Sequence, residues 1–498
     1  MSVRLEEVIG AKLAKNPDDR CFWWNGQWYT KSDLLILADE CEVRLRASGF
    51  TKGQRLVVMM PNCPIIIALS LALWRIGGTI SPLNVKSGLP SLLATLRLIE
   101  PFAVVTSDSI RSEVDDFLRE HGFKCVTAAP MGPLPILEGN VSAIETPELA
   151  VIFATSGTTG LPKAVPLTHG NIYDNCSVMW EALRPLAPGD VILDVLPNFH
   201  AFGYTLKMIM PIVQDAATAI VPGFMPPQQT VSAIRDAEVS IILAVPAVFS
   251  YLLSGIERGS APKDLLDKVK IMVAGGDRLP STLHETAKRV IGKDIVEGYG
   301  LTETSPCLAM TRSYEEYRPG TVGTVVTGYE WQLRAENGLP AEGDEGVLWV
   351  RGPSVTSGYF RSPEMTAERF DGSWFNTGDY VRVEDGYVRI LDRVTDIIIV
   401  GGFNVYPQEV ELALHSHPAV KTAIVVGMPH PVSGEIAKAF ILKNDGAEVS
   451  GREIIKYCKS RLAHFKVPRK VEFVDEFPLS GTGKILRRVL REKERGAG

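Results

Sequence analysis

The sequence lacks the signatures of several common protein classes. Its seven cysteines are scattered and none form a C-x-x-C pair, so neither a disulfide framework nor a zinc site is indicated. The longest apolar run, about residues 63–74, is shorter than the roughly 18–20 residues that cross a bilayer, and we expect a buried helix there. The first residues show no signal-peptide core, so we expect a cytoplasmic protein without a transmembrane segment.

An excess of charge of one sign is also missing. The net charge of −6 over 498 residues gives no reason to expect nucleic acid as a partner. A content of 45% hydrophobic and 22% charged residues is typical of a globular protein, and the length predicts two or more domains.

A phosphate-binding loop is indicated where a short apolar strand, residues 149–154, ends. The loop consists of small hydroxylated residues and glycines, followed by a lysine. Backbone N–H groups of such a loop can turn toward an anion, the hydroxyls add hydrogen bonds, and the lysine adds a positive charge. The residues expected to bind a polyphosphate are Thr155, Ser156, Gly157, Thr158, Thr159, Gly160 and Lys163.

This loop fits neither of two common nucleotide-binding fingerprints. A Walker A loop needs a glycine before the lysine and Ser or Thr after it, where this chain has Pro162 and Ala164. The dinucleotide fingerprint fails because Glu303 stands where the third glycine should follow Gly298 and Gly300. The loop instead closely resembles the phosphate loop of the adenylate-forming superfamily, which contains acyl-CoA synthetases, peptide-synthetase adenylation domains and luciferases.

A second motif of that superfamily is the run from Glu297 and Gly298 through Tyr299 to residue 304. Tyr299 can stack on a purine, Thr302 can donate to a phosphate, and Glu303 can hold a hard cation such as Mg²⁺. Upstream, an expected strand over residues 269–274 ends in two glycines. In the superfamily this turn, Gly275 and Gly276 here, borders the adenine and the acyl tunnel.

His200 lies in a loop that follows the expected strand 191–196. Ligands bind at such positions in open α/β sheets, although a lone histidine is more often structural. In the superfamily the histidine of this loop closes against the substrate carboxylate. The stretch has no acid that could pair with an α-ammonium group, which argues against an amino acid substrate.

The remaining motifs come late in the chain. Asp379, after Thr-Gly, can accept both hydroxyls of a ribose. Arg393 matches the superfamily's ribose- and phosphate-facing arginine. Lys484, in the run Ser-Gly-Thr-Gly-Lys, matches its catalytic lysine loop, and the alternative is a solvated basic tail. The superfamily hinge falls on Thr395, where its members usually have Asp or Lys.

Alternating strands and helices predict an α/β fold with mostly parallel sheets. Asn25-Gly26, between two apolar aromatic runs, predicts a hairpin. Residues 330–390 look like a β-rich subdomain. We expect a large acyl- and ATP-binding domain over residues 1–391, and a small mobile α+β domain with Lys484 over residues 392–498.

The resemblance implies a two-step reaction that uses ATP, Mg²⁺ and coenzyme A. A carboxylate attacks the α-phosphate of ATP to give acyl-AMP and pyrophosphate, and a thiol then displaces AMP. Lys484, His200 and Glu303 are the expected catalytic residues. The C-terminal domain would rotate between the steps, so that Gly401 and Gly402 make room for a pantetheine arm.

The identity of the acyl group is indicated only weakly. Apolar residues near His200 and in 242–249 favour a medium- or long-chain fatty acid, with aryl acids such as coumarate second. The acceptor could be CoA or the arm of a separate acyl carrier protein, because no carrier motif follows residue 488. A luciferase-like oxygenase would share every motif. A regulatory protein without catalysis is disfavoured because the ionic residues of the motifs are all present.

Overall fold

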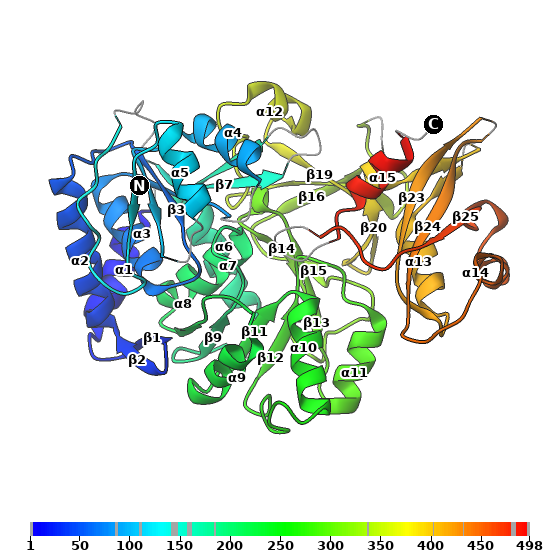
Figure 1. The fold of residues 1–498 in the computed structure, drawn as a ribbon, viewed down its shortest axis with the longest axis horizontal. Helices are drawn as coiled ribbons and strands as arrows, with labels where there is room; N and C mark the ends of the chain where they lie inside the picture. Colours follow the sequence, from blue (N-terminus) through cyan, green and yellow to red (C-terminus); the bar gives the residue numbers. More distant parts are fainter. Residues whose placement is uncertain are drawn as a thin grey trace. The chain divides into compact units, whose positions relative to one another are not determined.

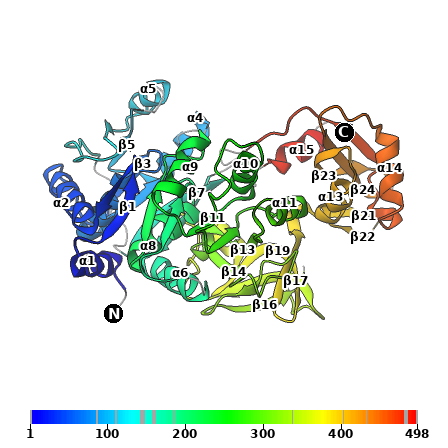
Figure 2. The same ribbon diagram turned by 90° about the horizontal axis from the view of Figure 1, so that it is seen from below.

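The computed structural model describes residues 3–84, 88–108, 112–140, 148–156, 162–183, 186–335, 338–401, 403–431, 433–479 and 485–495. The chain forms two compact units. The first unit is Met1–Glu330 with Val350–Phe375, and the second is Trp331–Trp349 with Asn376–Gly498 (Figures 1 and 2). The domain boundary expected near residue 391 stays a prediction.

One sheet of the first unit has the strand order β6-β5-β3-β4-β7-β8. Neighbouring strands in this sheet are parallel except for β7 and β8, which form an antiparallel pair. All five residues of β3 are buried, as expected for a strand covered on both faces. The strands are β3 (Arg55–Met59), β4 (Thr79–Pro82), β5 (Ala103–Thr106), β6 (Cys125–Thr127), β7 (Leu149–Ser156) and β8 (Pro162–Thr168).

A further run of strands in the first unit has the order β15-β14-β13-β12-β11-β9-β10-β1-β2. Its central strands are parallel, and the predicted hairpin at Asn25-Gly26 is confirmed, with both residues at positive φ between β1 and β2. The strands are β1 (Arg20–Trp24), β2 (Gln27–Thr30), β9 (Val191–Asp194), β10 (Ala217–Ile220), β11 (Ile241–Ala244), β12 (Ile271–Ala274), β13 (Val296–Gly300), β14 (Cys307–Met310) and β15 (Thr324–Val325). The short β18 (Phe370–Asp371) pairs with the start of β19 (Trp374–Glu384).

The helices of the first unit include the buried helix that the longest apolar run predicts. This helix, α3, is buried at every residue except Arg75, and α1 and α2 pack against it (Figure 1). The helices are α1 (Leu5–Lys15), α2 (Lys31–Ala47), α3 (Pro64–Ile76), α4 (Leu89–Ile99), α5 (Ser112–Glu120), α6 (His169–Ala182), α7 (Ala201–Gly203), the π-helix η1 (Tyr204–Ile209), α8 (Met210–Val213), α9 (Pro227–Asp236), α10 (Pro246–Glu257), α11 (Ser281–Ile291), the 3₁₀-helix η2 (Thr302–Thr304) and α12 (Pro363–Arg369).

The strands of the second unit form two groups. The strands β16 (Glu330–Arg334), β17 (Glu345–Arg351), β19 and β20 (Tyr387–Arg393) follow one another in that order. The other group has the order β22-β21-β24-β23, with β25 beside β24. Its elements are η3 (Val394–Asp396), β21 (Ile398–Val400), β22 (Phe403–Val405), α13 (Pro407–His415), β23 (Val420–His430), β24 (Gly434–Lys443), α14 (Gly451–Lys459), η4 (His464–Lys466), β25 (Lys470–Phe473) and α15 (Arg487–Arg495).

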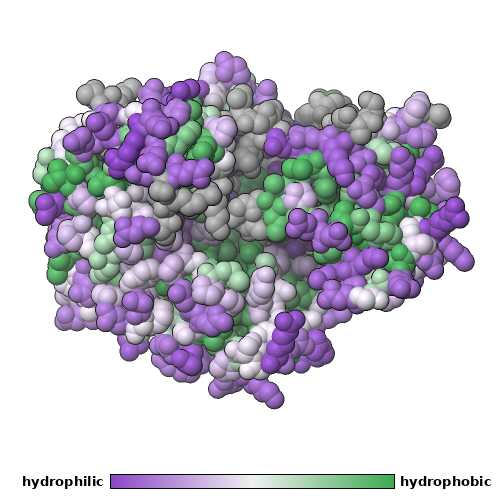
Figure 3. Space-filling view, in the orientation of Figure 1, coloured by the Kyte–Doolittle hydropathy of each residue, from purple (hydrophilic) through white to green (hydrophobic). Residues whose placement is uncertain are grey.

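The mixed sheets and helices confirm the predicted α/β fold with a smaller α+β part. Hydrophilic side chains predominate on the face seen in Figure 3, with apolar patches between them. In the described ranges, no helix has both the length and the apolar character that a bilayer crossing requires.

Candidate active site

The structure brings together two of the ionic residues that the sequence singles out, Lys163 and Glu303. Lys163 follows the predicted loop as the second residue of β8, and its Nζ lies 5.2 Å from the centre of the Tyr359 ring. The hydroxyl of Tyr359 donates to Oε1 of Glu303 at 2.8 Å. One buried tyrosine therefore touches both the expected phosphate-binding lysine and the expected cation-binding carboxylate.

A short stretch, residues 354–360, holds these two elements in place, and we call it the bracing segment. Thr356 donates its backbone N–H to the carbonyl of Glu303 at 2.9 Å and its hydroxyl to the carbonyl of Pro166 in β8 at 2.6 Å. Ser305 donates to the carbonyl of Ser354 at 2.7 Å, and Phe360 donates to the carbonyl of Ala164 at 2.8 Å. The positions of Lys163 and Glu303 are therefore coupled through main-chain contacts.

The side chain of Asn175 in α6 holds the turn that carries Glu303. This fully buried amide donates to the carbonyls of Thr304 and Cys307 at 3.1 and 2.8 Å and accepts from the N–H of Cys307 at 3.1 Å. Gly300 permits the turn because a Cβ there would lie 1.7 Å from the carbonyl oxygen of Pro306. The turn that follows β13 is therefore fixed by these hydrogen bonds.

The His200 loop meets the two-glycine turn and β13. A Cβ added to Gly275 would lie 3.3 Å from both the Phe202 ring and the carbonyl oxygen of Gly298. His200 precedes α7, is half-buried, and has its ring 5.2 Å from that of Phe199. Three predicted segments therefore converge at the carboxyl ends of β9, β12 and β13, where ligands bind in open α/β sheets.

Two predicted nucleotide-binding residues lie together in the second unit. Asp379 in β19 stands opposite Arg393 in β20, and Arg393 Nε lies 2.6 Å from Asp379 Oδ1. Asp379 is buried and Arg393 is half-exposed. A nested turn positions the carboxylate, because the hydroxyl of Thr377 accepts from the N–H of Asp379 at 3.1 Å and donates to the carbonyl of Leu348 at 2.7 Å.

Other predicted residues are placed only in part. Gly401 lies in the tight connection between β21 and β22 and donates its N–H to the carbonyl of Ser433 at 2.8 Å. The backbones of Thr155 and Ser156 end β7. Tyr299 and Thr302 are half-buried, and Gly276 follows β12. The residues outside the described ranges are Gly157, Thr158, Thr159, Gly160, Gly402 and Lys484.

A buried lysine behind the His200 loop was not predicted from the sequence. Lys207, in the π-helix η1, is fully buried, with its Nζ 5.0 Å from the centre of the Phe202 ring. Within the described residues, this Nζ has no hydrogen-bond partner, nor does Oδ2 of the fully buried Asp194. Burial lowers the pKa of Lys207 to about 7, against the opposing charge of Asp194, and burial raises the pKa of Asp194 well above its usual range.

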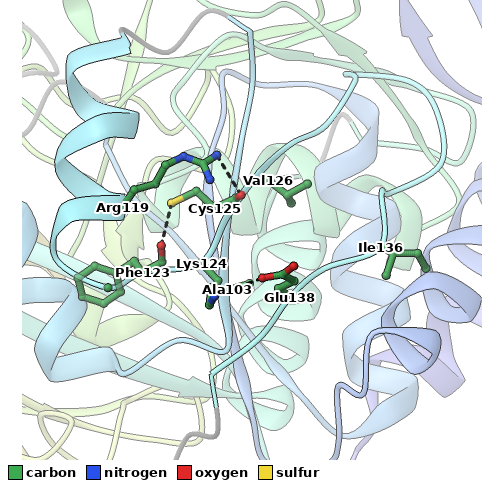
Figure 4. A pocket seen from close by; sticks show the side chains of 9 residues that line it. Ala103, Arg119, Phe123, Lys124, Cys125, Val126, Ile136 and Glu138 are labelled. Atoms are coloured by element: carbon green, nitrogen blue, oxygen red, sulfur yellow. Dashed lines mark hydrogen bonds and ion pairs between the residues drawn. The ribbon is translucent and has the colours of Figure 1, made fainter.

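A hollow of about 440 Å³ lies elsewhere in the first unit, beside β6 (Figure 4). Arg119 donates to the carbonyl of Cys125 at 3.3 Å, and Lys124 pairs with Glu138 at 3.2 Å. Both cations already have partners, and none of the predicted site residues lines the hollow. We therefore give it no part in the site.

Known proteins match this chain over most of its length. Residues 10–360 match the AMP-binding enzyme family, and residues 409–484 match the AMP-binding enzyme C-terminal domain. A feruloyl-CoA synthase of Amycolatopsis sp is 33% identical over 464 residues, 90% of either chain. A long-chain-fatty-acid–CoA ligase of Bacillus subtilis is 30% identical, covering 98% of this chain and 94% of its own. The crystal structure of ATP-bound MatB from Rhodopseudomonas palustris has a TM-score of 0.87 at 28% identity, covering 99% of both chains.

Proposed function

This chain belongs to the AMP-binding enzyme family and is an adenylating enzyme of the acyl-CoA synthetase type, and we propose the residues and the substrate with which it works. The observation that carries the proposal is the contact of one tyrosine, Tyr359, with both Lys163 and Glu303. A lysine and a carboxylate held at one corner can receive a polyphosphate and its counter-cation together.

In the first step, the substrate carboxylate attacks the α-phosphate of ATP, and negative charge gathers on the phosphates. Lys163, Thr302 and the hydroxyls of the loop 155–160 stabilise that charge. Tyr299 stacks on the adenine, and Asp379 with Arg393 binds the ribose. His200 closes against the carboxylate, and Lys484 lies between the carboxylate and the α-phosphate. The support for these roles is the convergence of the His200 loop, Gly275 and Gly298, and the pairing of Asp379 with Arg393.

The Glu303 carboxylate fits a magnesium ion that arrives with the nucleotide. Tyr359 fixes Oε1, and Oε2 accepts no hydrogen bond from any described residue. Mg²⁺ is usually bound through one or two carboxylates together with phosphate oxygens and water, so a single oriented carboxylate is a suitable donor. When bound, the ion would neutralise charge on the phosphates.

In the second step, a thiol displaces AMP from the acyl group. We propose that a turn of the C-terminal domain withdraws Lys484 and brings in the connection at Gly401 and Gly402 to admit the pantetheine arm. CoA is the proposed acceptor, and a separate acyl carrier protein is the alternative. We place the reaction in the cytoplasm, where CoA and ATP are both present.

For the acyl group we propose a medium- or long-chain fatty acid, with aryl acids second. Phe199 and Phe202 make the surroundings of His200 apolar, whereas Tyr204 is fully buried and donates to Ser70, so it belongs to the core. The two matched relatives are named for a long-chain fatty acid and for feruloyl-CoA, which supports both classes.

The test is pyrophosphate release with ATP and Mg²⁺ over a panel of fatty, aryl and amino acids, with CoA or a carrier protein as acceptor. We expect release with fatty acids and thioester formation with CoA. Lys484→Ala should lose about 100-fold or more of the adenylation rate but still form thioester from supplied acyl-AMP. Equal loss of both steps would overturn the assignment of Lys484, and release only with aryl acids would overturn the fatty acid.

A further inference from the structure

The last helix of the chain, α15, presents one charged face to its own unit. Arg487, Leu490, Arg491 and Glu494 stand three and four residues apart and so share that face. Leu490 is buried against Ile424, Val426 and Phe440 of β23 and β24. At the far end, Glu494 pairs with Lys438 at 2.8 Å. The helix is therefore anchored along its length, unlike a solvated basic tail (Figure 1).

Two arginines of this face reach the segment that joins β20 to β21. Arg491 Nη1 donates to the carbonyl of Thr395 at 2.5 Å and to Oδ1 of Asp396 at 2.6 Å. Arg487 Nε lies 3.8 Å from Oδ2 of Asp396. Arg487 also holds Glu411 of α13 at 2.6 and 3.1 Å and the carbonyl of Val425 at 2.7 Å. Asp396 is thus held between two guanidinium groups, and one of these groups also fixes the main chain at Thr395.

The segment that these arginines hold contains the position where a hinge is expected. Asp392, just before it, is buried, and it accepts from the backbone N–H of Arg393 at 2.8 Å and of Gln408, in the first turn of α13, at 3.0 Å. The side of the segment toward α13 is therefore held by Asp392, and Thr395 with Asp396 is held by α15.

We propose that Arg491, together with Arg487, is a positioning residue that makes the hinge segment and α15 move as one body; this rests on the proposed function. Arg487 comes three residues after Lys484, so the two Cα atoms are at most about 10 Å apart. Fixing α15 to Thr395 and Asp396 therefore fixes how far the lysine can reach from the hinge. Adenylation, which needs Lys484 accurately placed, depends on this clamp, and thioester formation from acyl-AMP does not.

The test measures the two half-reactions separately in Arg491→Gln, Asp396→Asn and the double variant of the full-length protein. We expect each single variant to adenylate about tenfold more slowly and to form thioester from supplied acyl-AMP within twofold of wild type. The double variant should be no slower than the worse single one, because the two residues act as a pair. Arg491→Lys should recover part of the adenylation rate.

The matched control is Glu492→Gln on the same helix. Among the described residues, Glu492 pairs only with Arg488, and its side chain is largely exposed. It should leave both half-reactions unchanged. The clamp is overturned if Arg491→Gln leaves adenylation unchanged, if it slows both half-reactions equally, or if the losses of the single variants simply multiply in the double variant. Failure of the wild-type protein to release pyrophosphate with any acid would instead contradict the proposed function.

Discussion

Lys207 in the first unit and Arg487 in the second are both cations inside the protein, but their surroundings differ. Lys207 is fully buried, lies over the Phe202 ring, and has no hydrogen-bond partner among the described residues. Arg487, 20% exposed, donates to both oxygens of Glu411 and to the carbonyl of Val425. Burial lowers the pKa of Lys207 to about 7, whereas the pKa of Arg487 is raised because Glu411, Asp392 and Asp396 outweigh its burial.

The difference reflects the side chains as well as their sites. A guanidinium carries five donors in a planar fork and remains charged, so it can join several acceptors into one network. An ammonium is a compact charge that loses its proton readily when water and acceptors are removed. The arginine therefore serves as a structural joint, whereas burial brings the pKa of the lysine to about 7.

Among the changes considered, replacing Arg487 should lower the free energy of unfolding the most. Arg487→Met leaves Glu411 and Asp396 short of a cation, and we expect the second unit to lose about 3–5 kcal/mol of unfolding free energy. Denaturant unfolding of the full-length protein measures this loss. Arg452→Met, at an exposed position of α14, is the matched control and should change stability by less than about 0.5 kcal/mol. If Arg487→Met also lost less than about 0.5 kcal/mol, Arg487 would not be a structural joint of the second unit.

We expect Lys207 to affect how the free energy of unfolding changes with pH. The folded pKa of Lys207 is about 7 against 10.5 when unfolded, so the unfolded state binds more protons between these values. Stability should therefore rise with pH from about 7 to 10, by up to roughly 1.4 kcal/mol per pH unit. Lys207→Met should abolish this rise. Persistence of the rise in that variant would assign it to another group.

Asp392 sharpens the comparison because it is a buried acid whose charge acts on Arg487. Burial raises the pKa of Asp392 from 3.8 to about 7, while Arg487 and the N–H of Gln408 lower it. Its folded state binds the proton more tightly, so this contribution is complete below about pH 4 and is lost as the pH rises through 7.

Asp392→Asn should flatten that slope in thermal unfolding measured from pH 4 to 7. At pH 7 the variant should also lose about 1–2 kcal/mol, because an amide cannot accept from both the N–H of Arg393 and that of Gln408. An unchanged slope would mean that Asp392 does not titrate in this range.

A third cation, Lys163, lies between the two extremes, half-buried over the Tyr359 ring. Tyr359→Phe keeps that ring and removes the hydrogen bond to Glu303. We expect the smallest effect here, about 1 kcal/mol, seen as a roughly fivefold fall in kcat/KM for ATP. Tyr251→Phe, on an exposed ring, is the control. Equal effects of Tyr359→Phe and Tyr251→Phe on kcat/KM would contradict a role for the Tyr359 hydroxyl.

Residues of the candidate site that have local signatures could be proposed from the sequence. Lys163 and Glu303 each stand in a short run with its own chemistry, and the structure places both on one tyrosine. Tyr359, Thr356 and Asn175 have no such signature, because each acts through a contact with residues more than 50 positions away.

The two buried cations show the same limit. Lys207 is a charged residue inside an apolar run, a signal that could have been read as a buried amine. Arg487 stands in a highly charged terminal stretch that reads as solvated, and only the tertiary fold shows it against Glu411. The α/β fold, the hairpin and the buried helix were predictable because they follow from alternation, turn residues and hydrophobicity.

The bracing segment has a consequence for biosynthesis. A chain that grows from its amino end exposes β8 early and Glu303 later, but Thr356, which bonds to the carbonyl of Pro166 190 positions before it, emerges after both. The contacts that join Lys163 to Glu303 therefore cannot be completed until residue 360 has left the ribosome, and a nascent chain that stalls earlier presents Lys163 and Glu303 without the tyrosine that joins them.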